Sequence, residues 1–170
     1  MRRAMTPKRL IELLRLAPLP IEGGYFRQTY EASELIEAAA LPDRYDRARS
    51  HGSAIYYLLH GAEFSALHRL RSDEVYHFYL GDPVEMLLLY PDGRHRVEIL
   101  GPDLEQGQQV QVVVSHGVWQ GSHLQAGGSW ALLGTTMAPA YAQDDFEPGE
   151  RAALVRQYPE VGALVEALTR

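Results

Sequence analysis

The chain has 170 residues and no cysteine, and its 16 basic and 22 acidic side chains leave a formal charge of −6. This length is enough for one domain that closes its own hydrophobic core. The missing cysteine excludes disulfide scaffolds, thiol nucleophiles and thiolate zinc sites, and it agrees with a reducing cytoplasm. Because the basic residues are scattered, a phosphate backbone would find no continuous attraction, and nucleic acid is not expected as a partner.

The hydropathy pattern gives no sign of a membrane segment. The longest unbroken apolar runs, such as Met86 to Tyr90, are far shorter than the roughly 20 residues of a membrane helix. Residues 2–17 contain several leucines, yet charged side chains such as Lys8 and Glu12 interrupt any signal-peptide apolar region. We therefore expect a cytoplasmic protein with no membrane partner.

The first element expected is a helix over about residues 7–17. Thr6 offers a capping hydroxyl, Pro7 suits the first helical position, and leucines then recur at helical spacing. From Gly23 onward polar and apolar residues alternate and β-formers are abundant, which predicts a strand. Residues 31–50 are mixed and charged, and we expect a surface loop there, with one short helical turn around residues 34–39.

A succession of short β-forming runs follows, separated by turn residues, which is typical of a sandwich or barrel. The candidates are Ala54 to Leu59, Phe64 to Leu70, Glu74 to Leu80, Val84 to Tyr90, Arg94 to Leu100, Gln109 to Val114, Trp119 to Leu124 and Trp130 to Met137. No long helix lies between them, which argues against a parallel α/β sheet. The pattern then turns helical over about residues 148–169. We expect a single domain over residues 1–170, with its barrel at about 23–146.

A histidine and a glutamate on adjoining strands mark a candidate pocket. Side chains alternate faces in a strand, so His68 shares a face with Ala66, while Glu74 shares one with Tyr76 and Phe78. If these apolar neighbours face the barrel interior, the imidazole and the carboxylate do so too. An ionised carboxylate buried there needs a partner, a metal or a raised pKa. A purely structural hydrogen-bonded pair is the alternative.

These residues also carry a resemblance to a known family. The stretch from Gly61 through His68 and Glu74 to Gly81 resembles the first motif of the cupin superfamily, and residues 115–120 lie where its second motif would fall. Further strings are similar to the fifth cupin family, which comprises largely uncharacterised single-domain proteins. These strings are Glu22-Gly-Gly-Tyr-Phe-Arg-Gln-Thr-Tyr, Ala54-Ile-Tyr-Tyr-Leu-Leu, Ser72-Asp-Glu-Val-Tyr-His-Phe-Tyr-Leu-Gly-Asp-Pro, Gly117-Val-Trp-Gln-Gly and Ala138-Pro. The resemblance covers about residues 6–157.

The resemblance implies an all-β fold, the double-stranded β-helix or jelly roll, with flanking helices at both ends of the chain. It also implies a homodimer. In the superfamily the metal is held by two histidines and a glutamate from the first motif and a histidine from the second. His68 and Glu74 stand at their positions, but Leu70 and Gln120 replace the other two ligands.

A leucine cannot ligate and a glutamine carbonyl is a weak ligand, so a three-histidine transition-metal site cannot form. A divalent metal on the reduced set His68, Glu74 and Gln120 stays an alternative, and no organic cofactor is indicated. His116 lies in the turn of the second motif, and His123 has the strand parity opposite to Gln120.

Without a metal, the pocket still offers acid–base groups. His68 could accept or deliver a proton near neutral pH, with Glu74 orienting its ring. This is similar to the cupin-fold sugar epimerases, in which a histidine base works across the sugar ring from a tyrosine acid. Tyr76 shares the face of Glu74 and is our first candidate for the acid, and Tyr141 is the second. Each tyrosine could instead be a packing residue.

The predicted ligand-binding residues are Arg27, Gln120, Trp119 and Tyr141. An inward guanidinium at Arg27 could clamp an anionic or hydroxylated ligand, whereas its alternative is a surface ion pair. Trp119 could stack on a sugar-like ring or simply close the barrel end. His77 has the face opposite to Glu74 and is expected in the core or at an interface.

Three functions therefore stay open. The first is an isomerase or epimerase-like enzyme that acts on a small polar or sugar-like substrate by metal-independent proton transfer. The second is a metal-dependent oxygenase or lyase with the reduced ligand set, and the third is a non-catalytic binding or storage protein for a small molecule. The fold cannot choose among them, because it hosts many chemistries.

Overall fold

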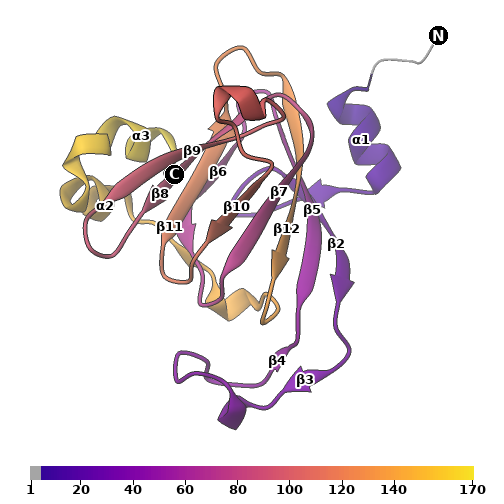
Figure 1. Cartoon of the computed structure of the whole chain (residues 1–170), viewed down its shortest axis with the longest axis vertical. Coiled ribbons are helices and arrows are strands. Elements are labelled where there is room, and N and C mark those ends of the chain that lie inside the picture. Colours follow the sequence, from indigo (N-terminus) through magenta and orange to yellow (C-terminus); the bar gives the residue numbers. More distant parts are fainter. Residues whose placement is uncertain (1–4) are drawn as a thin grey trace.

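The computed structural model describes residues 5–170, and most of its strands form two antiparallel sheets that face each other as a jelly roll (Figure 1). The six-stranded sheet contains, in spatial order, β1 (Ala17–Pro18), β2 (Tyr25–Glu31), β5 (Ser53–His60), β12 (Trp130–Met137), β7 (Glu74–Gly81) and β10 (Gln111–Val114). The five-stranded sheet contains β13 (Glu147–Pro148), β6 (Phe64–Arg69), β11 (Trp119–Leu124), β8 (Val84–Leu89) and β9 (His95–Leu100). The predicted all-β fold with flanking helices is confirmed.

The first helix, α1 (Pro7–Leu14), ends earlier than the sequence predicts. Its start agrees with expectation, since the Thr6 hydroxyl accepts a hydrogen bond from the N–H of Arg9. The helix stops because Arg15 adopts the left-handed conformation, with φ 53°, and its N–H returns to carbonyls of the last turn. The next residues then pair with β2 as strand β1 instead of continuing the helix to residue 17.

The excursion between β2 and β5 is also more β-like than predicted. It contains β3 (Leu35–Ile36), a 3₁₀ turn η1 (Ala38–Ala40) and β4 (Arg49–Ser50), in place of the helical turn expected at residues 34–39. Strands β3 and β4 pair with each other and extend from one end of the barrel (Figure 1). Two further 3₁₀ turns are η2 (Leu104–Gln106) and η3 (Gln143–Asp145).

The C-terminal part contains α2 (Arg151–Gln157), the 3₁₀ turn η4 (Pro159–Val161) and α3 (Gly162–Ala167). Helix α2 begins after residue 148 because Pro148 still pairs with His68, and the Glu150 carboxylate then caps the helix. None of the helices in residues 5–170 combines the length and the apolar character that crossing a bilayer would require.

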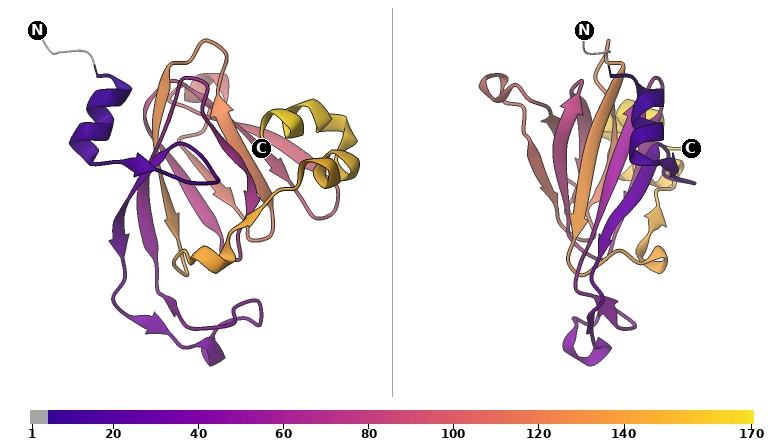
Figure 2. Two further views of the ribbon diagram at one scale, coloured as in Figure 1. Left: turned by 180° about the vertical axis from the view of Figure 1, so that it is seen from behind. Right: turned by 90° about the vertical axis from the view of Figure 1, so that its right-hand side faces the viewer.

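The helices cover the outer faces of the two sheets (Figure 2). Helix α1 packs Leu10 against Leu58 and Leu132 of the six-stranded sheet. Helices α2 and α3 cover the five-stranded sheet on the other side of the molecule through a second apolar cluster. That cluster comprises Leu67, Leu87, Leu89 and Trp119 from the sheet, with Leu154, Tyr158, Val165 and Leu168 from the helical part.

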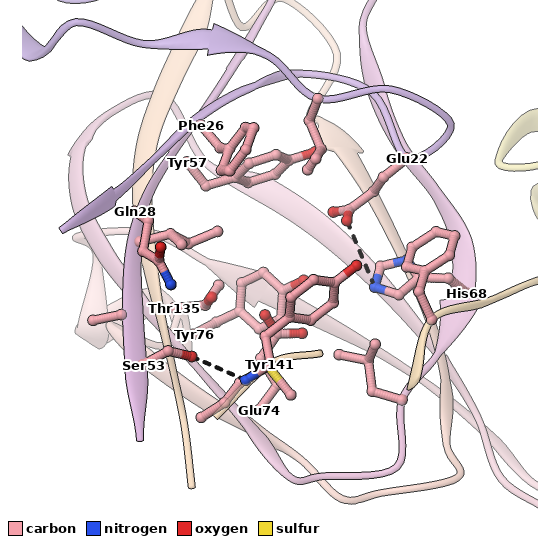
Figure 3. Close-up of a pocket in the computed structure, with 16 residues that line it drawn as sticks. Glu22, Phe26, Gln28, Ser53, Tyr57, His68, Glu74, Tyr76, Thr135 and Tyr141 are labelled. Atoms are coloured by element: carbon pink, nitrogen blue, oxygen red, sulfur yellow. Dashed lines mark hydrogen bonds and ion pairs between the residues drawn. The ribbon is translucent and has the colours of Figure 1, made fainter. Parts of the chain in front are cut away.

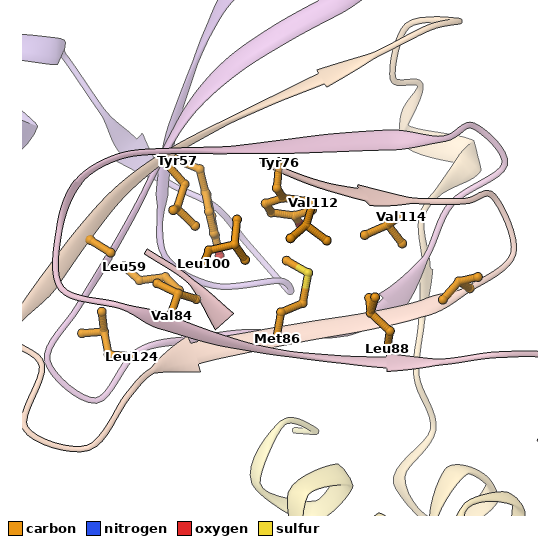
Figure 4. Close-up of a cluster of buried hydrophobic side chains, with 13 residues drawn as sticks. Tyr57, Leu59, Tyr76, Val84, Met86, Leu88, Leu100, Val112, Val114 and Leu124 are labelled. Carbon is orange, nitrogen blue, oxygen red and sulfur yellow. The ribbon is translucent and has the colours of Figure 1, made fainter. Parts of the chain in front are cut away.

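The space between the sheets is divided into two sides. Where β7 and β10 face β8 and β9, apolar side chains fill the interior, and we call this the packed side (Figure 4). Its members include Val84, Met86, Leu88, Leu100, Val112 and Val114. Where β2, β5, β12 and the start of β7 face β6, the inward residues leave a cavity, and we call this the pocket side.

Candidate functional site

The pocket side contains a cavity of about 260 Å³, shown in Figure 3. Its polar lining residues are Glu22, Gln28, Ser53, His68, Glu74 and Thr135. Its aromatic lining residues are Phe26, Tyr57, Tyr76, Tyr141 and Phe146, and its aliphatic ones are Leu19, Ala54, Ile55, Leu70 and Met137. The cavity therefore brings together His68 and Glu74, as the strand alternation predicts, and adds both candidate tyrosines.

His68 lies on β6 with only 1% of its surface exposed. Its Nδ1 lies 2.8 Å from the backbone carbonyl of Ala66, and its ring stacks on Phe146 with 4.9 Å between ring centroids. Because a carbonyl can only accept, Nδ1 carries the proton, and in the neutral ring Nε2 is the proton acceptor. Nε2 points toward Glu22, with 4.0 Å to its Oε2 (Figure 3).

Glu22 is the site residue that the sequence reasoning missed. It lies in the loop between β1 and β2, and its Oε1 accepts a 2.8 Å hydrogen bond from the Ser65 hydroxyl. The two glycines that follow it both have positive φ, 104° at Gly23 and 74° at Gly24, so the chain turns sharply here. The only available signal was that Glu22 opens the first family string, just before these glycines.

Glu74 begins β7 and is almost fully buried. Its Oε2 accepts a 2.9 Å hydrogen bond from the side-chain amide of Gln120. Burial raises the pKa of Glu74, while the nearby His68 and the hydrogen bonds from Thr135 and Gln120 act in the opposite direction. The cavity thus holds a carboxyl group that binds its proton more tightly than an exposed glutamate.

The two tyrosines differ in access. Tyr76 is buried, and its pKa is raised well above the ordinary value by burial and by Glu74. Tyr141 is 39% exposed, and burial together with Glu22 and Glu74 raises its pKa to about 12. Both phenols therefore keep their proton at neutral pH, and Tyr141 is the one that also reaches solvent.

Tyr141 belongs to the covering segment, residues 138–147, which lies over the cavity. The backbone N–H of Tyr141 donates a hydrogen bond to the Ser53 hydroxyl at 3.1 Å (Figure 3). A buried ion pair holds the far end of the segment, because the Arg49 guanidinium contacts both Asp145 carboxylate oxygens, at 2.7 and 3.2 Å. Both side chains are almost fully buried, so the excursion between β2 and β5 and the covering segment are fixed to each other.

Three of the four predicted ligand-binding residues, Arg27, Gln120 and Trp119, are not among the residues that line the cavity. Gln120 is buried and donates its side-chain amide to Glu74. Arg27 faces the outer side of β2, with its guanidinium 5.4 Å from the centre of the Tyr56 ring, because its neighbours Phe26 and Gln28 take the inward positions. Trp119 packs in the cluster beneath α2 and α3, with the Arg69 guanidinium over its ring. Neither Arg27 nor Trp119 can clamp or stack on a ligand in this cavity.

The three other histidines considered in the sequence analysis, His77, His116 and His123, have partners away from the site. His77 lies on the outer face, 3.0 Å from the Thr136 hydroxyl. His116 pairs with Asp73 at 2.8 Å, and His123 lies 3.2 Å from Glu85.

The donor set does not fit a metal. Within residues 5–170, no group of three or more histidine and carboxylate side chains converges on one point. Gln120 donates its amide nitrogen to Glu74 Oε2, so that carboxylate oxygen already has a partner, while Gln120 Oε1 makes no hydrogen bond within the described residues. Leu70 lines the cavity where the superfamily has a second histidine. The reduced set of His68, Glu74 and Gln120 therefore does not assemble a coordination site.

Comparison with known proteins defines the class. The superfamily model described as "Cupin superfamily (DUF985)" matches residues 8–148, so this chain is a cupin. More narrowly, it belongs to the family which that model describes, in agreement with the resemblance seen in the sequence. No curated protein matches the chain.

Solved structures agree with this assignment. Protein SO0799 from Shewanella oneidensis is 30% identical, with a TM-score of 0.86 over 98% of this chain and 99% of that one. A hypothetical protein from Leishmania major is 27% identical, with a TM-score of 0.85 over 97% and 99%. Oxalate decarboxylase from Bacillus subtilis is only 10% identical, with a TM-score of 0.53 over 90% of this chain and 37% of that one, and it shares the fold alone.

Proposed function

We propose that the protein binds a small molecule in the cavity and moves a proton to or from it at Nε2 of His68. The observation that carries this proposal is the fixed tautomer: Nδ1 donates to the Ala66 carbonyl, so the lone pair of Nε2 is available inside a cavity. A histidine with an available ring nitrogen can act as a general base without any metal.

The reaction class that suits these groups is isomerisation or epimerisation next to a carbonyl. His68 Nε2 takes the proton from the C–H bond, and that electron pair forms the enolate. The Tyr141 hydroxyl then donates its proton to the opposite face of the same carbon, which inverts the centre. The histidine releases its proton to solvent and the tyrosinate regains one, so the net change is the inversion alone.

Each group in this scheme has physical support. Glu22 lies beside Nε2 and favours the imidazolium that forms after proton abstraction. The pKa of about 12 keeps Tyr141 protonated until it donates, and its exposure allows exchange with solvent. Tyr76 is fully enclosed, so we assign it to shaping the cavity in place of the catalytic part expected from the sequence.

The test is incorporation of solvent deuterium. A panel of small aldoses, ketoses and amino ketones is incubated with the protein in D₂O, and loss of the C–H signal next to the carbonyl is followed by ¹H NMR. We expect a member of the panel to exchange, and His68→Gln to slow that exchange by about 10²- to 10⁴-fold, the usual contribution of a general base. The matched control is His77→Gln on the outer face of the same barrel, which should exchange at the wild-type rate.

A specific alternative is a non-catalytic binding protein, which the apolar character of most of the lining favours. In that case a ligand binds in a His68-dependent manner while no deuterium enters it. Exchange that is equally fast in His68→Gln would exclude His68 as the base.

A further inference from the structure

The ligand's charge can be inferred from what lines the cavity. Two carboxylates, Glu22 and Glu74, face one imidazole, and neither lysine nor arginine is among the lining residues that the structure describes. Fully ionised, these side chains leave a net charge of −1. Burial keeps water from screening this charge, so the cavity disfavours phosphates and carboxylates.

The basic residues nearest the cavity are turned away from it. Arg27 stacks on Tyr56 outside the barrel. Arg170 binds the backbone carbonyls of Ile21 and Glu22 from the other side of the loop, and its guanidinium lies over Phe64. Both guanidinium groups are therefore engaged by other partners, and neither arginine is among the residues that line the cavity.

The aromatic lining points in the same direction. Phe26, Tyr57, Tyr76, Tyr141 and Phe146 contribute rings to one small cavity. The face of an aromatic ring carries negative potential, and several such faces around a pocket favour an ammonium group. A carboxylate inside an aromatic cavity is the combination that recognises amines.

Glu22 is the carboxylate best placed to receive the cation. It keeps a 14% exposed side chain, whereas Glu74 is buried and already accepts a hydrogen bond from Gln120. One Glu22 oxygen is occupied by the Ser65 hydroxyl, and the other faces the cavity at 4.0 Å from His68. The His68 ring is 1% exposed, and its Nε2 makes no hydrogen bond within the described residues. The Glu22 Oε2 and the His68 Nε2, 4.0 Å apart, therefore both lack a close hydrogen-bond partner among residues 5–170.

We propose that the cavity is specific for a small amine, a cation with an apolar or aromatic body whose ammonium group binds Glu22. The cavity of about 260 Å³ suits a ligand of this size. This inference rests on the proposed small-molecule site, but it concerns charge and does not depend on proton transfer.

The experiment compares ligands of equal shape and different charge. The first set is 2-phenylethylamine, neutral 2-phenylethanol and anionic 3-phenylpropanoate, and the second is choline with neutral 3,3-dimethylbutan-1-ol. Binding is measured by calorimetry and thermal shift in a buffer with chelator. We expect at least one cation to bind about tenfold more tightly than its neutral partner, and the anion not to bind.

The variant Glu22→Gln keeps the acceptor for Ser65 and removes the charge, so the cation should lose its advantage over the neutral partner. Glu63→Gln is the matched control, because Glu63 also faces a histidine, His60, at 3.5 Å, but lies outside the cavity. This control should bind as the wild type does.

Four outcomes overturn the inference. In the first, neither cation binds. In the second, the neutral partner binds as tightly as the cation. In the third, the preference survives in Glu22→Gln. In the fourth, a divalent metal added without chelator stabilises the protein in a Glu22-dependent way while the amines do not. The proposed function fails separately, when His68→Gln leaves deuterium exchange unchanged, so the two failures are distinguishable.

Discussion

The packed side and the pocket side of the barrel interior are built from the same kind of strand, but their inward side chains differ. On the packed side, inward positions of β8 and β10 carry Met86, Leu88 and Val112, and these apolar side chains pack the two sheets against each other. On the pocket side, the equivalent positions carry groups such as His68 and Glu74. One pair of sheets therefore combines a side filled by apolar side chains with a side that holds a cavity with polar lining groups.

The largest loss of stability is expected on the pocket side, at the buried ion pair that holds the covering segment. Asp145→Ala leaves the Arg49 guanidinium buried without its main partner, and we expect a loss of about 3 to 5 kcal/mol in the free energy of unfolding. Urea denaturation measures it. The double variant Arg49→Met, Asp145→Leu should recover much of the loss, since two apolar side chains restore packing without a stranded charge. A cost below about 1 kcal/mol for Asp145→Ala would contradict the importance of this pair.

On the packed side, Met86→Ala should cost about 2 to 5 kcal/mol in the free energy of unfolding, because its side chain is 1% exposed and leaves a cavity. Ligand affinity should not change, since Met86 does not line the pocket. The measurements are urea denaturation and calorimetry on the same variant. A parallel loss of affinity would show that the two sides are not separate.

The free energy of unfolding should also depend on pH because of Glu74 on the pocket side. Burial raises the pKa of Glu74 above its ordinary value of 4.5. Between 4.5 and the raised pKa the folded state holds more protons than the unfolded state, so this group's contribution to stability falls as the pH rises through that window. Relative to Glu74→Gln, the wild type should lose stability there and then level off.

Unfolding of both proteins by urea at a series of pH values gives this difference directly. Glu105→Gln is the control, because Glu105 is exposed on η2 and should leave the pH dependence unchanged. Parallel stability curves for the wild type and Glu74→Gln would show that the Glu74 pKa is not raised in the folded protein.

The smallest change in stability is expected at the mouth of the pocket. The Tyr141 hydroxyl is near solvent and, within the described residues, bonds only Gln143, at 3.1 Å, so Tyr141→Phe should alter the free energy of unfolding by no more than about 0.5 kcal/mol. Inversion of the substrate carbon should nonetheless fall by about 10²-fold or more, since the acid is lost, while His68 still exchanges the proton with solvent. Tyr30→Phe, at an exposed tyrosine of β2, is the control. Inversion that survives in Tyr141→Phe would exclude Tyr141 as the acid.

The alternation of side chains along the strands determines which site residues could be predicted from the sequence. It places His68 and Glu74 inside, because apolar neighbours fix the face of each strand. The same rule could have placed Trp119, since the residue before an inward Gln120 must face outward. The orientation of Arg27 was harder to predict, because neither face of its strand is clearly the apolar one.

Glu22 could not be found by periodicity at all. It lies in a loop, and its position depends on two left-handed glycines and on the hydrogen bond from Ser65, a residue far away in the chain. The early end of α1 has a similar origin, because the left-handed Arg15 is a local backbone choice that leucine spacing does not encode. Loop geometry is therefore what limits the prediction of this pocket.

The position of β12 between β5 and β7 has a consequence for how the chain is made. Strand β12 is the last long strand of the sequence, yet it supplies both neighbours with hydrogen-bond partners. During synthesis, the edges of β5 and β7 that pair with β12 therefore have no partner until β12 has been made. The edge of β5 carries the apolar run from Ile55 to Leu59, which can pair with another chain. Pairing with β12 closes both edges, so the strand that completes this sheet also removes its exposed hydrogen-bonding groups.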